Sequence, residues 1–459
     1  MGKDELRQLS KDDLVRLVLV LQDQIARLRK NSSTSSKPPS SDIVKPPKSK
    51  PKKGGKRKIG GQPGHKRHER KQLDPGEIDF TVIYDPGVCP DCGGPLDETG
   101  HPPRVVDQIE VVERPTYTTR HEAPWRECAP CGIQVQSGLP PEVVKAGLAG
   151  PRLTAIVAYL KGVCHASYAT VRKFLRDVLH IRISRGQLTK LIGKASDALD
   201  PVYMELLRAL PEQAYLNVDE TGHKENGRRM WSWVFRAPGF SVFVLDVSRG
   251  SKVLQRVLGE AFGGVLGSDY YSAYRKYVSD GNVRAQFCMA HLIRDIKYLT
   301  TLSDKVTQNY GERVLGCFKR FFGVLHRAEN MTESGFERAI KKARLDLEKT
   351  ATRAPMRTEA QNIAKRFKDH KGAYFEFLTT PGMGPTNNVA EQEIRHLVID
   401  RKVTQGTRGP VGRRWSERLW TVAASCNRQG RRVFDVIEEA IQAHLGGDPA
   451  PSLLTHAPP

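Results

Sequence analysis

Three acidic residues, each in a segment of different character, constrain the fold of this chain most strongly. Asp219 closes a short apolar run in AYLNVDETGHK, and Asp269 closes another in GGVLGSDYYSAY. Both runs have the composition of β-strands. Glu391 lies much later, in GPTNNVAEQEIR, where a helical pattern begins. The pattern predicts a fold in which two carboxylates at strand ends meet a third on a late helix.

Carboxylates arranged in this way suit divalent metal ions. Mg²⁺ prefers hard oxygen ligands and keeps coordination positions open for phosphate and water, and Mn²⁺ accepts similar ligands. Two such ions about 4 Å apart can activate an attacking oxygen and stabilise a leaving one during phosphodiester transfer. The formal charge of +22 and the pI near 9.7 indicate a polyanionic partner. Together these features predict chemistry on nucleic acid.

The positive charge is concentrated near the N-terminus. Residues 30–72 hold 14 Lys and Arg against two acids, which gives +12 of the total +22. This stretch is also rich in Ser, Pro and Gly, so we expect a flexible basic linker that binds phosphate without selecting a sequence. We find no apolar run near the ~18 residues of a membrane span and no signal peptide. A cytoplasmic protein without a membrane partner is expected.

A short heptad pattern precedes the linker. Two-stranded parallel coils favour Val or Ile at the first apolar position of the heptad and Leu at the second. The residues that follow this rule are Leu14, Val18, Leu21, Ile25 and Leu28. The pattern predicts a coiled coil between two copies of the chain. The alternative is an amphipathic helix that packs on its own protein.

Two pairs of cysteines follow the linker, Cys89-Pro-Asp-Cys92 and Cys128-Ala-Pro-Cys131, and glycine follows each pair. Four thiolates in two such knuckles suit tetrahedral Zn²⁺. The pattern predicts a zinc ribbon with a structural ion. Strand-like residues between the knuckles, including 117–121, are expected to form its hairpins.

Residues 151–210 show helical periodicity in three stretches, and Ser167 and Ser184 are expected to cap two of the helices. Two of these helices could form a DNA-binding helix-turn-helix. A plain helical region that braces the core is preferred, because the connection lacks a glycine at the usual turn.

The next part of the chain alternates strands and helices. Short β-branched and aromatic runs predict strands at 215–219, 230–236, 240–246 and 264–269, with a helix at 251–259. This order, with acids at the ends of the first and fourth strands, is typical of an RNase H-like core. A basic helical stretch at about 304–371 fits an insertion before the helix that carries Glu391.

Several segments together resemble the DDE transposases of the insertion sequence 66 family. They are IGGQPGHK, CPDCGG, LNVDETGHK, GSDYYSAY, FCMAHLIRD and PTNNVAEQEIRHLVIDRK, which follow the family's order over nearly the whole chain. The resemblance implies that Asp219, Asp269 and Glu391 form the metal-binding triad. In that family Arg usually follows the catalytic Glu, whereas Gln392 and Glu393 follow it here.

The resemblance also implies a reaction: metal-dependent cutting at the ends of a mobile element, followed by attack of the freed 3′-OH on target DNA. The expected partners are the terminal inverted repeats, target DNA, a second or further copy of the chain, and accessory proteins of the same element. One alternative is a zinc-ribbon DNA-binding regulator with an inactive nuclease-like fold. Another is a nuclease that cuts without joining.

Nearby residues offer competing interpretations of each acid. Glu220 is adjacent to Asp219 on a strand and so faces the other way. Asp246 also ends a strand and could replace Asp269. Glu393 lies about 200° around a helix from Glu391, so only one of them can face the other acids.

Two further patterns in this region have alternative interpretations. Asn388 and Glu391 have the spacing of a capping box, so Glu391 could cap its own helix. His291 follows Cys288 in a C-x-x-H pattern. It is expected either as a core histidine or as an active-site residue.

We therefore predict a multidomain α+β protein. Its expected parts are a coiled-coil helix (1–30), a basic linker (31–78), a zinc ribbon (79–142), a helical region (143–212), an RNase H-like catalytic domain (213–403, with a helical insertion at about 301–380) and a C-terminal helical region (404–459).

Overall fold

The computed structural model describes residues 9–28, 30–31, 74–84, 90–95, 138–454 and, within 105–136, all but 107, 110, 113–114, 128 and 132. Most of the predicted basic linker, together with Cys89 and Cys128, lies outside the described residues. The chain divides into two compact units, one of 1–47 with 120–459 and one of 48–119. In the second unit a short 3-10 helix, η2 (Pro75–Glu77), is preceded by Asp74, whose backbone N–H donates to Glu77 Oε2 at 2.9 Å.

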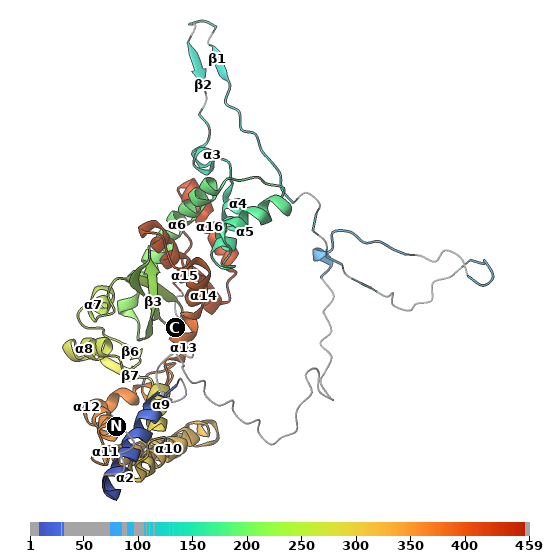
Figure 1. Cartoon of the computed structure of the whole chain (residues 1–459). Helices are drawn as coiled ribbons and strands as arrows, with labels where there is room; N and C mark the ends of the chain where they lie inside the picture. The colour runs from blue at the N-terminus through green and yellow to red at the C-terminus, as the bar shows by residue number, and fades with distance from the viewer. Residues whose placement is uncertain are drawn as a thin grey trace. The chain divides into compact units, whose positions relative to one another are not determined.

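A five-stranded mixed sheet lies at the centre of the first unit (Figure 1). Its strands are β3 (Tyr215–Glu225), β4 (Arg228–Arg236), β5 (Ser241–Asp246), β6 (Val265–Ser268) and β7 (Arg284–Phe287), in the order β5-β4-β3-β6-β7. The first three form an antiparallel meander, whereas β6 and β7 run parallel to β3. The strands predicted from short β-branched and aromatic runs are confirmed, although β3 extends further than expected.

Helices complete the alternation around the sheet, so the predicted α+β class is confirmed. α7 (Lys252–Leu258) connects β5 to β6, as predicted for 251–259. α8 (Ser272–Asp280) lies between β6 and β7, and α9 (Met289–Leu299) follows β7 directly. The domain boundaries expected from the sequence remain predictions.

Two groups of helices pack together beside the meander. The first is α3 (Pro141–Ala146), α4 (Pro151–Lys161), α5 (Tyr168–Asp177) and α6 (Arg185–Arg208), and the second is α15 (Pro410–Gln429) and α16 (Val433–Gly446). The expected caps are confirmed: Ser167 accepts from Thr170 N and Ser184 from Gln187 N, each at 3.1 Å. α6 packs against α15 and α16, and one continuous apolar core joins these helices to the sheet.

One segment of the described residues, Pro141–Lys161, has the length and mean hydropathy (21 residues, 1.3) of a membrane-spanning helix. The structure divides it into α3 and α4 at Gly147–Gly150, and α4 buries Ala155, Val157 and Ala158. These side chains belong to the apolar core that α4 shares with α6 and α16. The apolar residues of α4 are therefore those of a core helix, whereas α3 buries no residue.

Side chains of α15 cover the exposed edge of the sheet. β5 is an edge strand, so every second backbone N–H points away from β4. Ser425 Oγ accepts from Ser241 N at 3.1 Å, and Thr421 Oγ1 accepts from Phe243 N at 3.0 Å. Glu417 accepts from Leu245 N at 2.7 Å. Because these residues lie four apart, one helix face follows the strand and satisfies its free N–H groups.

A second apolar core forms between α9 and α13 (Asn388–Glu393), where the helical insertion was expected. It is built by α10 (Lys305–Leu325), α11 (Glu333–Thr352) and α12 (Thr358–His370), and it includes Tyr310, Phe321 and Leu347. β7 and α9 contribute Phe287 and Ile296 to this core, which joins the three helices to the edge of the sheet.

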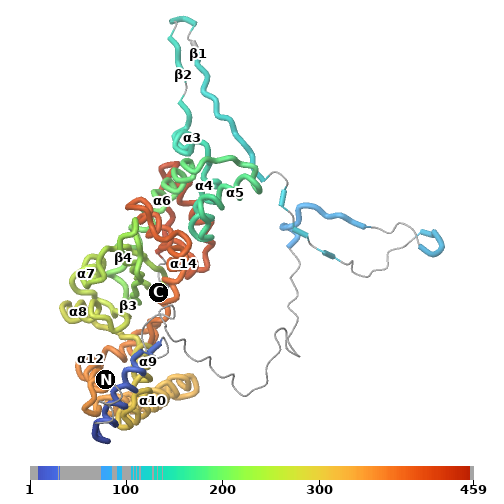
Figure 2. Tube along the Cα trace, in the orientation of Figure 1, coloured from blue at the N-terminus to red at the C-terminus, as the bar shows by residue number. Residues whose placement is uncertain are grey.

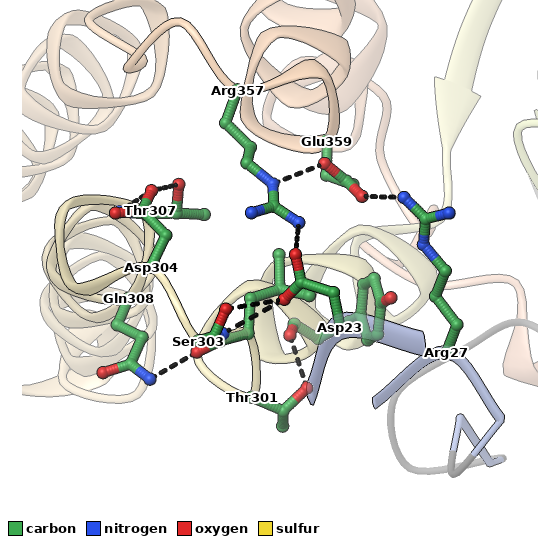
Figure 3. A network of polar contacts seen from close by, with 11 residues as sticks. Asp23, Arg27, Thr301, Ser303, Asp304, Thr307, Gln308, Arg357 and Glu359 are labelled. Atoms are coloured by element: carbon green, nitrogen blue, oxygen red, sulfur yellow. Dashed lines mark hydrogen bonds and ion pairs between the residues drawn. The ribbon is translucent and has the colours of Figure 1, made fainter. Parts of the chain in front are cut away.

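The N-terminal helix α2 (Lys11–Leu28) lies against this insertion (Figure 2). Asp23 accepts from Ser303 Oγ at 2.9 Å and pairs with Arg357, while Glu359 bridges Arg357 (2.9 Å) and Arg27 (3.1 Å), as Figure 3 shows. Ala26 packs against the apolar core of the insertion.

These contacts leave the predicted seam of α2 facing away from the insertion. The five seam residues are between 37% and 70% exposed. α2 therefore packs on its own protein through its polar face, which is the alternative that the sequence offered. Its five seam residues stay exposed on the opposite face.

A two-stranded hairpin, β1 (Trp125–Glu127) and β2 (Gln134–Gln136), flanks the second cysteine knuckle. The expectation of a strand at 117–121 was wrong, since these residues form no regular structure. Strand composition placed the strand at the wrong residues, because a short exposed segment forms a strand only where another segment pairs with it.

We predict that Thr421→Val will lower the free energy of unfolding by about 1–3 kcal/mol, because the buried Phe243 N–H loses its acceptor. Thr189→Val is the control, since Thr189 is exposed on α6 and its replacement should change stability by less than about 0.5 kcal/mol. Chemical denaturation measures both. A Thr421→Val protein as stable as the original would show that the edge contact contributes nothing.

Candidate active site

Asp219 and Asp269 lie level with each other on neighbouring parallel strands. The register pairs Tyr215 with Val265 and Asn217 with Gly267, and two more residues along each chain bring Asp219 opposite Asp269. Adjacent strands lie about 4.8 Å apart, so the two backbones are close where β6 ends beside the middle of β3. The prediction that an acid follows a strand holds for Asp269. It was wrong for Asp219, which lies inside β3 because the pairing with β4 extends this strand to Glu225.

The third acid lies on α13 (Asn388–Glu393), and Asn387 attaches this short helix to the sheet. Asn387 is 2% exposed. Its Nδ2 donates to Val218 O at 2.8 Å, and its Oδ1 accepts from Asn217 Nδ2 at 3.0 Å. The contact is made next to Asp219, so the start of the helix is held beside the end of β3.

Two neighbouring strands make this attachment possible. Gly267 on β6 leaves room for the Asn217 amide, with which a Cβ atom at that position would clash. After β7, Cys288 N donates to Ser268 O at 2.8 Å, and Cys288 Sγ accepts from Asn387 N at 3.2 Å. β3, β6 and β7 therefore all contribute to the position of α13.

Glu391 does not cap its own helix. α13 begins at Asn388, and no side chain caps it, so the alternative of a capping box is not formed. Glu391 Oε1 lies 3.4 Å from His291 Nε2. The same oxygen is buried and has no hydrogen-bond partner among the described residues. A buried carboxylate oxygen without a donor is costly unless a cation or ligand binds it.

Glu393 and Asp246, the two competing acids, have partners of their own. Glu393 Oε1 accepts from Ser241 Oγ at 2.6 Å. Asp246 pairs with Arg256 at 2.7 Å. Each therefore points to β5 or α7, away from His291 and Glu391.

The carboxylates at the site affect one another's protonation. Burial raises the pKa of Asp219 well above its usual value, and the negative charges of Glu220, Asp269 and Glu391 raise it further. Burial also raises the pKa of Asp269, which a hydrogen bond from Tyr271 N partly opposes. The raised pKa values mean that these acids are crowded and poorly neutralised by the protein itself.

Glu220 belongs to a separate polar cluster. It accepts from Arg249 Nε at 2.7 Å and from the Tyr274 hydroxyl. Burial, followed by the nearby charge of Asp269, raises its pKa to about 7. The Arg249 guanidinium in turn lies 3.9 Å from the ring centre of Tyr271. These contacts hold the side chain of Glu220 and so stabilise β3 at the residue next to Asp219.

His291 lies beside the acids and is 9% exposed. Its burial lowers the pKa of the imidazole, but Cys288, Glu391 and Asp269 outweigh this effect, so the pKa is raised. The two interpretations of the sequence are therefore not exclusive, because His291 is buried and also contacts Glu391.

Within the part of the chain that the structure describes, no three His, Cys, Asp or Glu side chains already form a metal-binding group. The residues nevertheless fit a divalent cation. Asp219, Asp269 and Glu391 supply hard oxygen ligands, one of these oxygens is buried without a donor, and the acids repel each other. Bound cations relieve such repulsion.

The predicted zinc ligands can be placed only in part. Cys92 and Cys131 are exposed, whereas Cys89 and Cys128 lie outside the described residues. The zinc site stays a prediction.

Sequence reasoning missed two supporting groups. Asn217 could have been identified from the sequence, because a polar amide inside an apolar strand needs a buried hydrogen-bond partner. Arg249, which lies after β5, has no local pattern that would have identified it as the partner of Glu220.

Comparison with known proteins adds the family. A family model described as "Transposase IS66 family" matches residues 146–414, which is more than half of the 459 residues and includes all three acids. A "Family of unknown function (DUF6444)" matches residues 3–71. The comparison with curated proteins gave no match.

Proposed function

This chain belongs to the IS66 family of transposases, and we propose that it cuts the ends of a bacterial insertion sequence and joins the freed 3′-OH ends to target DNA. The observation that supports this reaction most directly is the level register of Asp219 and Asp269, with Glu391 attached beside them. The same observation favours an RNase H-like catalytic fold. A transposase processes DNA, and the family implies the use of a divalent metal in general.

Asp219, Asp269 and Glu391 would hold Mg²⁺ or Mn²⁺, which when bound activates the attacking oxygen and stabilises the leaving one. The other residues of the site position these carboxylates. Asn387 fixes the helix of Glu391 to β3, and His291 lies within 3.4 Å of the Glu391 carboxylate and can orient it. Water and then DNA provide the nucleophile, so no covalent protein intermediate is required.

Two alternatives make different predictions. A DNA-binding regulator with an inactive nuclease-like fold would not need its acids, yet all three are present and crowded together. A nuclease that only cuts would release ends without joining them. Strand-transfer assays with purified protein and labelled ends separate cutting from joining.

We further propose that two copies pair through α2 so that both element ends meet. The five seam residues are exposed, whereas Asp23 and Arg27, which contact the insertion, lie on the other face of the helix. The exposed apolar residues follow the heptad rule, so a second copy of α2 is the partner that fits them. The site of action would be the cytoplasm, where bacterial DNA is found.

The triad is tested by Asp219→Asn, Asp269→Asn and Glu391→Gln. Each change removes one charge with little change in volume, and loss of one group that acts on the transition state costs roughly 10²–10³ in rate. Each variant should therefore lose at least about 10²-fold in cleavage and strand transfer while it still binds element ends.

The matched controls are Asp246→Asn and Glu393→Gln, which should keep substantial activity because these acids bind Arg256 and Ser241. Full activity in Asp219→Asn would refute the mechanism. Loss of DNA binding in all five variants would favour the regulator.

The α2 pairing is tested by Leu21→Asp, which places a charge in the seam and should convert dimers to monomers in light scattering. Val20→Asp is the control, because it adds the same charge off the seam at a position that is 53% exposed. A monomeric original protein, or a dimeric Leu21→Asp variant, would rule out this interface.

We also propose a structural Zn²⁺ held by Cys89, Cys92, Cys128 and Cys131. Elemental analysis of protein purified without chelator should find close to one zinc per chain. Cys92→Ser should release it, whereas Cys164→Ser, a change outside the knuckles, should not. Original protein without zinc would end this proposal.

A further inference from the structure

The tip of the β3–β4 hairpin and the loop that follows α14 (Arg395–Thr404) form one surface. Thr407 N donates to Lys224 O at 2.9 Å, and Asn226 N donates to Thr407 O at 3.0 Å. Gly406 has a φ of +94°, and a Cβ there would clash with the carbonyl of Lys224. Only glycine lets the loop approach the hairpin this closely. We call residues 224–229 and 402–414 the hairpin–loop surface.

This surface is strongly basic. Its exposed cations are Lys224, Arg228, Arg229, Lys402, Arg408 and Arg414. Its acid, Glu225, faces Arg413 at 3.8 Å and is only 16% exposed. None of the six exposed cations has an ion pair among the described residues, so their charge is available to a partner.

Two of these cations are placed unfavourably in the free protein. Lys224 and Arg229 are direct cross-strand partners in the β3–β4 ladder. Side chains in such a pair lie about 5 Å apart at Cβ, and like charges there destabilise the hairpin. An anion bound between them would remove this repulsion.

β3 connects the acids to this surface. It carries both Asp219 and Lys224, and five residues of strand span about 17 Å. A DNA duplex presents about ten backbone charges over that length. Lys224 faces the opposite side of the strand from Asp219, whereas Arg228, the ladder partner of Glu225, lies on the side of Asp219. On that side, Arg401 of α14 donates to Thr221 Oγ1 at 3.0 Å and connects the helix after Glu391 to the strand.

We propose that the hairpin–loop surface binds the phosphate backbone of the duplex next to the phosphate that is cut. This inference rests on the proposed function for the position of the cut at the acids. DNA fits a surface of exposed cations without ion pairs, because phosphate contacts through Arg and Lys dominate protein–DNA interfaces.

The test compares two triple variants of the full chain. One carries Arg228→Gln, Arg229→Gln and Arg408→Gln. The other removes three exposed charges from α11 of the insertion, through Arg338→Gln, Lys341→Gln and Lys342→Gln. Binding to a fluorescent duplex of random sequence is measured without divalent metal over a range of salt concentrations, because phosphate contacts do not depend on sequence.

The hairpin–loop triple should bind more weakly, and its plot of log affinity against log salt should be less steep by about 2 to 3, or about 1 per lost phosphate contact. The α11 triple should change much less. An unchanged slope in the hairpin–loop triple, or an equal loss in both triples, would overturn the proposal. So would normal DNA binding with selective loss of binding to polyglutamate, which would indicate an acidic protein.

Gly406→Ala tests the geometry without a change in charge. It should separate the loop from the hairpin and weaken duplex binding, and the thermal midpoint checks that the protein stays folded. Affinity equal to that of the original protein would show that hairpin and loop do not act together. Binding is measured without metal, so its outcome does not depend on cleavage. A protein that binds DNA through this surface but does not cleave it would contradict only the proposed function.

Discussion

Backbone hydrogen bonds between β3 and β6 hold the first part of β3 parallel to β6, and the site depends on this pairing. The register pairs Asn217 with Gly267, so the residues two positions further along each chain become neighbours. These residues are Asp219, inside β3, and Asp269, directly after β6. A shift of one residue would turn one of the two side chains to the opposite face. The hydrogen bond between Asn217 and Asn387, and the close approach of Asn217 to Gly267, oppose such a shift because it would break both contacts.

The third acid depends on side-chain contacts and not on the ladder. Asn387 forms an amide bridge from the start of α13 to Val218 and Asn217. Buried amides with satisfied donors and acceptors specify one arrangement strongly, because every alternative leaves a polar group unpaired. Glu391 is therefore positioned by a rigid contact that lies next to Asp219.

The crowded acids work against folding stability. Burial and mutual repulsion raise the pKa of Asp219 and Asp269, and an oxygen of Glu391 is buried without a donor. The elements around the site are held by satisfied contacts: α15 supplies acceptors to the free edge of β5, and Arg249 pairs with Glu220. Three mutually repelling acids held by such a frame are typical of a functional site.

The sequence by itself determined the family, the class of fold and the local elements. Strands, most helices and the Ser167 and Ser184 caps followed from periodicity and capping preference, which act over a few residues. Only the tertiary structure decided which acids share a neighbourhood, that Glu220 pairs with Arg249, and that Thr421 covers the edge of β5. It also decided that Thr407 joins the tip of β3. These contacts connect residues far apart in the chain, and their geometry depends on strand register and helix packing, which no local pattern encodes.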